Sequence, residues 1–156
     1  LLSLFDTNDF NFFKSDRSTT AELQSLINRV NIANNINADL FVSIHHNTAG
    51  ATAKGVEVYY SSSAQDDTFG GGYSAERLAK SKDLAAAVSS NIASAVGTPN
   101  RGAKDSAFKV VRNTKMPSIL IETGFISNPE EAARCADSNS QTKVAKAIAD
   151  AISARY

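Results

Sequence analysis

The sequence predicts an α/β domain in which helices cover both faces of a mostly parallel, twisted sheet. Two runs of mainly apolar residues, at 39–44 and 116–121, are typical of strands buried on both faces. Between and after them lie longer segments whose apolar residues recur every three or four positions, the pattern of amphipathic helices. Because strands alternate with helices along the chain, helices packed on both faces of one sheet are the favoured architecture.

Composition is consistent with one domain and indicates no polyanionic partner. The chain has 156 residues, of which 42% are hydrophobic and 21% charged, enough for one core. Sixteen basic residues balance 16 acidic ones, so neither nucleic acid nor an anionic membrane surface is indicated as a partner. No apolar run approaches the roughly 20 residues of a membrane helix, so we expect no membrane insertion. The single cysteine, Cys135, excludes an internal disulfide and a thiolate metal site.

The first half of the chain predicts one helix and two strands. A short apolar run at 1–5 and a polar loop at 6–18 precede a capping box formed by Thr19 and Glu22, which starts a helix. The apolar run at 39–44 predicts the first buried strand. An alternating run at 56–60 predicts another strand, with Glu57 on its solvent-facing side. A glycine-rich loop at 61–73 follows.

The second half predicts three helices and two strands. Ser74 begins a long helix that Gly97 and Pro99 end. A turn at 100–102 and a short strand at 108–111 precede the buried strand at 116–121. Asn128 can cap a helix that has a proline at its first position. The last helix is expected around residues 142–154, where apolar residues share one face.

The two buried strands both end on side chains that can do chemistry. His45, His46 and Asn47 follow the first, and Glu122 ends the second. Ligands of such sheets bind beyond the carboxyl ends of the strands, so we expect His45 and Glu122 to share a site. Side chains alternate along a strand, so at most one of the two histidines faces Glu122. A purely structural histidine and a carboxylate in an ion pair or helix cap are the alternatives.

Imidazole is a good zinc ligand, and a carboxylate beside zinc can act as a general base toward water. A catalytic zinc needs about three protein ligands, however, and one histidine with one glutamate do not supply them. From the residues alone, the site is therefore a candidate and not a complete metal centre.

Four segments resemble the zinc-dependent N-acetylmuramoyl-L-alanine amidases of bacterial cell-wall turnover, the type-3 amidase family. Residues 38–47 resemble that family's strand ending in Ser-Ile-His-x-Asn, and residues 116–128 resemble its signature catalytic segment. Residues 29–34 resemble its helix motif of an arginine followed by Ala-Asn, and residues 100–104 resemble its turn before the substrate-side strand. These segments occur in the family's order across nearly the whole chain.

The resemblance implies roles for two residues. His45 would be a ligand of a Zn²⁺ cofactor and Glu122 the catalytic carboxylate, whereas His46 falls at a variable position of the motif. The fold implied is phosphorylase/hydrolase-like. The reaction implied is hydrolysis of the amide between the lactyl group of N-acetylmuramic acid and L-alanine in peptidoglycan. The place of action would be extracellular or in the cell wall, reached by secretion or by release at lysis, and the full protein could carry a separate cell-wall-binding module.

The family's two other zinc ligands, a histidine in a Gly-His-Gly-type loop and a glutamate on the following helix, have no counterpart in residues 1–156. We therefore expect residues 1–156 to be an amidase catalytic domain that lacks its N-terminal strand, loop and helix. Such a chain alone is expected to bind zinc weakly.

Three further residues are candidates for substrate contacts. Asn47 follows His45, and Arg112 and Asn113 follow the short strand predicted beside Glu122. Two alternative functions stay open at this point. One is a zinc carboxypeptidase-like metallopeptidase on a related α/β scaffold, and the other is a non-catalytic cell-wall-binding relative that keeps the fold without its metal.

Overall fold

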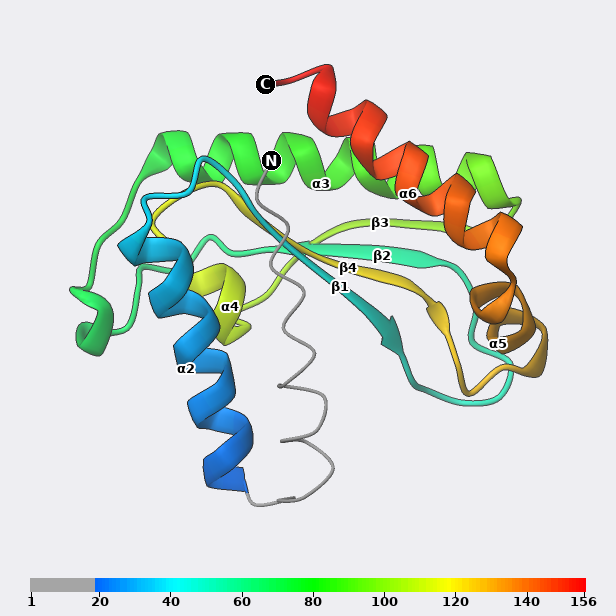
Figure 1. Cartoon of the computed structure of the whole chain (residues 1–156), viewed down its shortest axis with the longest axis horizontal. Coiled ribbons are helices and arrows are strands. Elements are labelled where there is room, and N and C mark those ends of the chain that lie inside the picture. The colour runs from blue at the N-terminus through cyan, green and yellow to red at the C-terminus, as the bar shows by residue number, and fades with distance from the viewer. Residues whose placement is uncertain (1–18) are drawn as a thin grey trace.

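The computed structural model describes residues 19–156, with side chains described from Leu23 onward. The expected apolar run at 1–5, the loop at 6–18 and the capping-box side chains at 19 and 22 lie outside this description. The elements in chain order are α2 (Thr19–Asn35), β1 (Phe41–Asn47), β2 (Val56–Tyr60), the short 3₁₀ helix η1 (Asp67–Phe69), α3 (Ala75–Val96), β3 (Asn100–Asp105), α4 (Lys109–Arg112), β4 (Ser118–Phe125), α5 (Pro129–Ala136) and α6 (Ser138–Ser153) (Figure 1).

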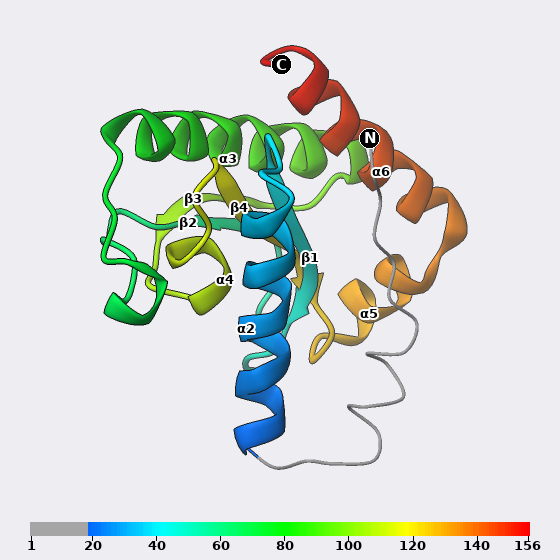
Figure 2. The same ribbon diagram turned by 60° about the vertical axis from the view of Figure 1, so that its left-hand side comes forward.

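The described strands form one sheet in the order β1-β4-β2-β3. β1 pairs with β4 in parallel, β2 pairs with β3 in parallel, and β2 pairs with β4 antiparallel. Helices α3 and α6 lie on one face of this sheet, and α2 and α4 lie on the other (Figures 1 and 2). The predicted fold class, a mostly parallel sheet with helices on both faces, is confirmed.

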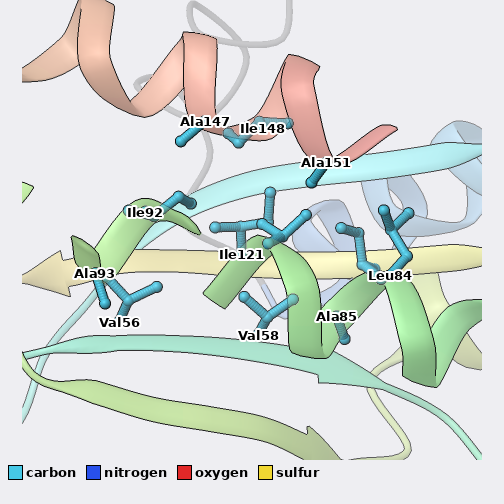
Figure 3. Close-up of a cluster of buried hydrophobic side chains, with 12 residues drawn as sticks. Val56, Val58, Leu84, Ala85, Ile92, Ala93, Ile121, Ala147, Ile148 and Ala151 are labelled. Atoms are coloured by element: carbon cyan, nitrogen blue, oxygen red, sulfur yellow. The ribbon is translucent and has the colours of Figure 1, made fainter. Parts of the chain in front are cut away.

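Two hydrophobic clusters hold the layers together, one on each face of the sheet. The larger lies under α3 and α6, where fully buried Leu84 and Ile92 of α3 pack against Val58 and Ile121 of the sheet (Figure 3). The smaller lies under α2 and α4, and its buried members are Val30, Val110, Val111 and Leu120. Odd-numbered residues of β4 therefore pack into the larger cluster and even-numbered residues into the smaller one. This is why the central strand is apolar at both odd and even positions.

The helix ends follow the predicted capping chemistry. The Ser74 hydroxyl accepts a hydrogen bond from the backbone N–H of Arg77 at the start of α3, and Gly97 adopts a left-handed conformation (φ 69°) at its end. The Asn128 side chain accepts from the backbone N–H groups of Glu130 and Glu131 at the start of α5, where Pro129 is the first residue. Helix α6 begins at Ser138, earlier than predicted, because Asp137 caps it there.

Two predicted elements were wrong. Residues 100–105 form the strand β3 and not a turn. The sequence did not predict this strand because an edge strand this polar carries no apolar signal. The apolar run at 108–111 is not a strand, because residues 109–112 form the single helical turn α4, which places Val110 and Val111 in the smaller core. A short apolar run does not by itself distinguish a strand from a buried helical turn.

Strand β1 is also less buried than its sequence predicted. It lies at an edge of the described sheet, and Ile44 is 56% exposed. Within residues 19–156, no helix combines the length and the apolar character that crossing a membrane requires.

Candidate active site

The register of the sheet brings three chemically active side chains into one row. His45 of β1 is the register partner of Glu122 of β4, and Glu57 of β2 is the partner of Glu122 on its other side. Residues directly opposite each other on paired strands point to the same face of a sheet. The row therefore runs from an imidazole through two carboxylates on the face that carries the smaller core. The expectation that His45 and Glu122 lie side by side agrees with this register.

Glu122 stands out by the surroundings of one of its carboxylate oxygens. Its Oε2 is buried and has no hydrogen-bond partner among the described residues. Burial, followed by the negative charge of Glu57, raises the pKa of Glu122 to about 7. A carboxylate of this kind exchanges a proton readily near neutral pH, which is the property of a general base.

Glu57 has the opposite environment, although it is only 3% exposed. Its carboxylate accepts hydrogen bonds from Arg101 Nε (2.5 Å), Lys104 Nζ (2.6 Å), the Tyr59 hydroxyl (2.5 Å) and Asn47 Nδ2 (3.2 Å). Burial alone would raise its pKa, but the hydrogen bonds from Lys104, Tyr59 and Arg101 outweigh burial and lower the pKa to about 2. Glu57 is therefore a fixed negative charge beside Glu122.

The solvent-facing position predicted for Glu57 was wrong. The alternation of side chains along β2 was predicted correctly. The face of the sheet on which Glu57 lies, however, is covered by Tyr59 and the smaller core and is not open to solvent. Arg101 and Lys104 were not predicted as site residues either. The signal available was their place in the family-like segment 100–104, although their contact with Glu57 depends on the pairing of β3 with β2.

The two histidines point to opposite faces, as strand alternation predicted. His45 is exposed on the Glu122 face, and its pKa is lowered by loss of hydration, then by the positive charges of Arg29 and His46. The ring is therefore neutral near pH 7, the form that binds metals. His46 lies on the α6 side, where its Nδ1 is 2.7 Å from the Thr123 hydroxyl.

The metal-ligating potential of the site is partial. Among the residues that the structure describes, no three His, Cys, Asp or Glu side chains are placed to hold a metal ion. His45, with its neutral imidazole, and the unpartnered oxygen of Glu122 suit a divalent cation beside them. The donor set thus fits one ligand and one adjacent base of a zinc centre.

The three predicted substrate contacts have different surroundings. Asn47 lies in the row itself, bound to Glu57. Asn113 is 0% exposed, and its side chain and carbonyl bind Asp66, Gln65 and Asn34, surroundings that favour a structural role, and its contact with substrate stays a prediction. Arg112 pairs with Asp66 at 2.5 Å and donates to the carbonyl of Ala64, which ties it to the loop at 61–73. Its contact with substrate stays a prediction.

Comparisons with known proteins identify a family that matches most of this chain. The profile of the N-acetylmuramoyl-L-alanine amidase family matches residues 8–154. The N-acetylmuramoyl-L-alanine amidase LytC of Bacillus subtilis is 38% identical over 133 residues, which are 85% of this chain and 24% of that protein.

Two solved structures resemble the fold as well as the sequence. The N-acetylmuramoyl-L-alanine amidase of Clostridium difficile 630 is 36% identical with a TM-score of 0.70, over 83% of this chain and 63% of that one. The catalytic domain of the amidase CwlV from Bacillus (Paenibacillus) polymyxa var. colistinus is 38% identical with a TM-score of 0.67, over 81% and 63%. The chain spans less than two thirds of the length of each of these three relatives. By sequence and by fold, the chain belongs to the N-acetylmuramoyl-L-alanine amidase family.

Proposed function

We propose that this chain is the catalytic domain of a peptidoglycan amidase, which hydrolyses the amide between N-acetylmuramic acid and the L-alanine of the stem peptide. The observation that carries the proposal is the buried oxygen of Glu122, which has no hydrogen-bond partner within the described part of the chain and lies beside the neutral imidazole of His45. Membership of the amidase family supports the choice of substrate.

In this proposal Glu122 is the general base and later the acid. Its free oxygen accepts a proton from the attacking water, whose oxygen forms the new bond to the lactyl carbonyl carbon. The C–N bond then breaks, and Glu122 returns the proton to the departing amino group of L-alanine. Burial and the negative charge of Glu57 raise the pKa of this carboxyl group in the metal-free site, which favours the return of the proton.

His45 would hold a Zn²⁺ cofactor as one of its ligands. When bound, the zinc would polarise the scissile carbonyl and lower the pKa of its water. The positive charge of the cation would also favour the ionised form of Glu122. His45 contributes a neutral ring that needs no deprotonation before it can bind.

The proposed partner is peptidoglycan, and the proposed place of action is therefore the cell wall or the extracellular space. The chain spans only part of its relatives, so a separate cell-wall-binding module in the full protein is compatible with the proposal. Asn47 and Arg112 are retained as proposed substrate-binding residues.

The experiment is digestion of purified peptidoglycan by the full-length protein, loaded with zinc, and by its Glu122→Gln variant. The parent should release new amino termini of L-alanine without free C-terminal amino acids. Removal of the base should lower the rate about 100- to 10,000-fold. Glu130→Gln, an exposed neighbouring carboxylate in α5, is the matched control and should keep the parental rate.

Three results would overturn the proposal. Release of free C-terminal amino acids by the parent would favour the carboxypeptidase-like alternative. Parental wall lysis by Glu122→Gln would remove Glu122 from catalysis, and binding of the wall with no hydrolysis by the parent would favour a non-catalytic relative.

A further inference from the structure

A pair of basic side chains lies at the other end of the row that begins with His45. Arg101 and Lys104 of β3 both donate to the same oxygen of Glu57, at 2.5 and 2.6 Å. Two positive charges thus share one buried negative charge, and the cluster keeps a surplus of one positive charge. The proposed hydrolysis gives neither cation a role.

Both cations keep donors available for a ligand. The Arg101 side chain is 41% exposed and that of Lys104 is 36% exposed. Among the described residues, Arg101 donates a hydrogen bond through Nε, and none is formed by the two terminal nitrogens of its guanidinium group. In the described part of the chain, the Lys104 ammonium group donates to Glu57 alone. A guanidinium fork with free terminal nitrogens suits a carboxylate oxygen pair.

Contacts with neighbouring residues fix the positions of the Arg101 and Lys104 side chains. Glu57 is buried and is itself fixed by Tyr59 and Asn47. The guanidinium carbon of Arg101 also lies 5.1 Å from the centre of the Phe125 ring, which belongs to β4, the strand of Glu122. Preorganised donors lose less conformational entropy when a ligand binds than mobile surface side chains do.

The distance from Glu122 matches a short piece of peptide. The charged groups of Arg101 and Lys104 lie 2.5 and 2.6 Å from Glu57 Oε1, and Glu57 lies on β2, the strand next to β4. Neighbouring strands are about 4.8 Å apart, so the cations are about 5–8 Å across the sheet from Glu122. An extended peptide advances about 3.3–3.6 Å per residue, so this gap corresponds to about two residues.

We infer that Arg101 and Lys104, held by Glu57, form a subsite for a free carboxylate on the peptide side of the scissile amide. The inference rests on the proposed function for the position of that amide. The substrate class selected is a muramoyl peptide with an ionised carboxylate on its second residue. The surplus of one positive charge matches one such group. A carboxamide at the same place would offer no charge to the subsite.

The test measures binding of two probes that differ only in this group. They are the peptide L-alanyl-D-glutamate and its α-carboxamide, L-alanyl-D-isoglutamine, titrated into the protein by NMR, which tolerates millimolar dissociation constants. We expect the parent to bind the carboxylate at least 10-fold more tightly than the carboxamide. Arg101→Gln and Lys104→Met should each weaken carboxylate binding at least five-fold and leave carboxamide binding unchanged.

Two variants serve as controls. Lys146→Met removes an exposed ammonium group from α6 on the opposite side of the sheet and should keep parental discrimination. Arg101→Lys keeps the charge and should retain most of the preference for the carboxylate, even if Arg101→Gln fails to fold because Glu57 loses a partner. Thermal unfolding of each variant establishes that it is folded.

The subsite would be overturned if the parent bound the two probes equally tightly or bound neither of them. It would also be overturned if folded Arg101→Gln and Lys104→Met bound the carboxylate as tightly as the parent does. Its failure is separable from that of the proposed function. A parent that hydrolyses peptidoglycan without discriminating the probes keeps the amidase and loses the subsite. A parent that discriminates them without hydrolysing keeps the subsite and loses the amidase.

Discussion

Glu57 and Glu122 face each other across the antiparallel pairing of β2 with β4, and they titrate at opposite ends of the carboxylate range. The pKa of Glu57 is lowered to about 2, whereas that of Glu122 is raised to about 7. Four side-chain donors surround the first carboxylate, and one oxygen of the second has no partner among the described residues. Neighbouring carboxyl groups with opposed environments are a recurrent sign of divided roles, one permanently charged and the other exchanging protons.

Glu122→Gln should stabilise the metal-free protein at alkaline pH. The folded pKa of Glu122 lies above its unfolded value of 4.5, so the folded state holds the proton more tightly and stability falls as pH rises from 4.5 to about 7. The glutamine amide does not ionise, so the variant does not lose this stability. We expect its free energy of unfolding to exceed that of the parent by about 1–2 kcal/mol above pH 7, after allowance for solvent screening. Urea unfolding with a chelator present, repeated from pH 4 to 8, measures it. An advantage that persists undiminished below pH 4.5 would contradict the argument.

Glu57→Gln should have the opposite effect. The folded pKa of Glu57 lies below its unfolded value, so its contribution is complete above pH 4.5 and is lost as pH falls toward 2. At pH 7 the variant should lose about 1–3 kcal/mol, because Arg101 and Lys104 lose their buried partner. The pKa of Tyr59, now raised to about 12 by burial and by Glu57, should fall. Urea unfolding measures the stability, and NMR titration of the ring measures the pKa of Tyr59. An unchanged pKa of Tyr59 would contradict this explanation.

Glu131→Ala should destabilise the fold by about 3 kcal/mol or more. Glu131 is 4% exposed and accepts from the backbone N–H groups of Gly55 and Phe125 and from the Thr98 hydroxyl. Its removal leaves these donors and Arg134 Nε without this acceptor, while Arg134 Nη2 keeps the carbonyl of Thr123. Glu130→Ala, its exposed neighbour in α5, is the matched control and should change stability by less than about 0.5 kcal/mol. Similar losses in the two variants would show that helix α5 as a whole, and not the Glu131 contacts, is responsible.

Gly124→Ala should also destabilise the protein, through close packing and not backbone strain. A Cβ atom at this position would collide with the terminal nitrogen of Arg134 and lie 2.8 Å from Glu131 Oε2. Gly50→Ala is the control, since a Cβ there meets nothing within 4 Å. We expect a loss of about 1–3 kcal/mol at position 124 only, measured by thermal unfolding. Equal thermal stability of the two variants would contradict the crowding.

His45→Ala should weaken zinc binding, whereas His46→Ala should not. Only His45 shares the face of Glu122, and His46 is occupied with Thr123 on the other side. Loss of a ligand should cost more than the roughly 10- to 100-fold loss that follows removal of a group supporting a ligand. Equilibrium dialysis against zinc measures both affinities without any need for activity. Equal losses in the two variants would exclude His45 as a specific ligand.

Much of the fold and part of the site were predictable because they depend on local chemistry. Ser74, Gly97 and Asn128 mark helix ends by side-chain capping and backbone conformation, which act within a few residues. The strand ending at Glu122 is apolar at successive positions because both of its faces are covered. The placement of His45 with Glu122 followed from the rule that parallel strands end at one edge of a sheet.

The sequence by itself determined the α/β class, the caps, the apolar central strand and the pair formed by His45 and Glu122, since each follows from the period or the ends of a single element. Only the tertiary structure decided that residues 100–105 are a strand, that 109–112 are a helical turn, and that Glu57 is buried against Arg101 and Lys104. These features depend on which strands become neighbours. Contact between residues more than 40 positions apart is decided by the packing of the whole sheet and not by local propensity.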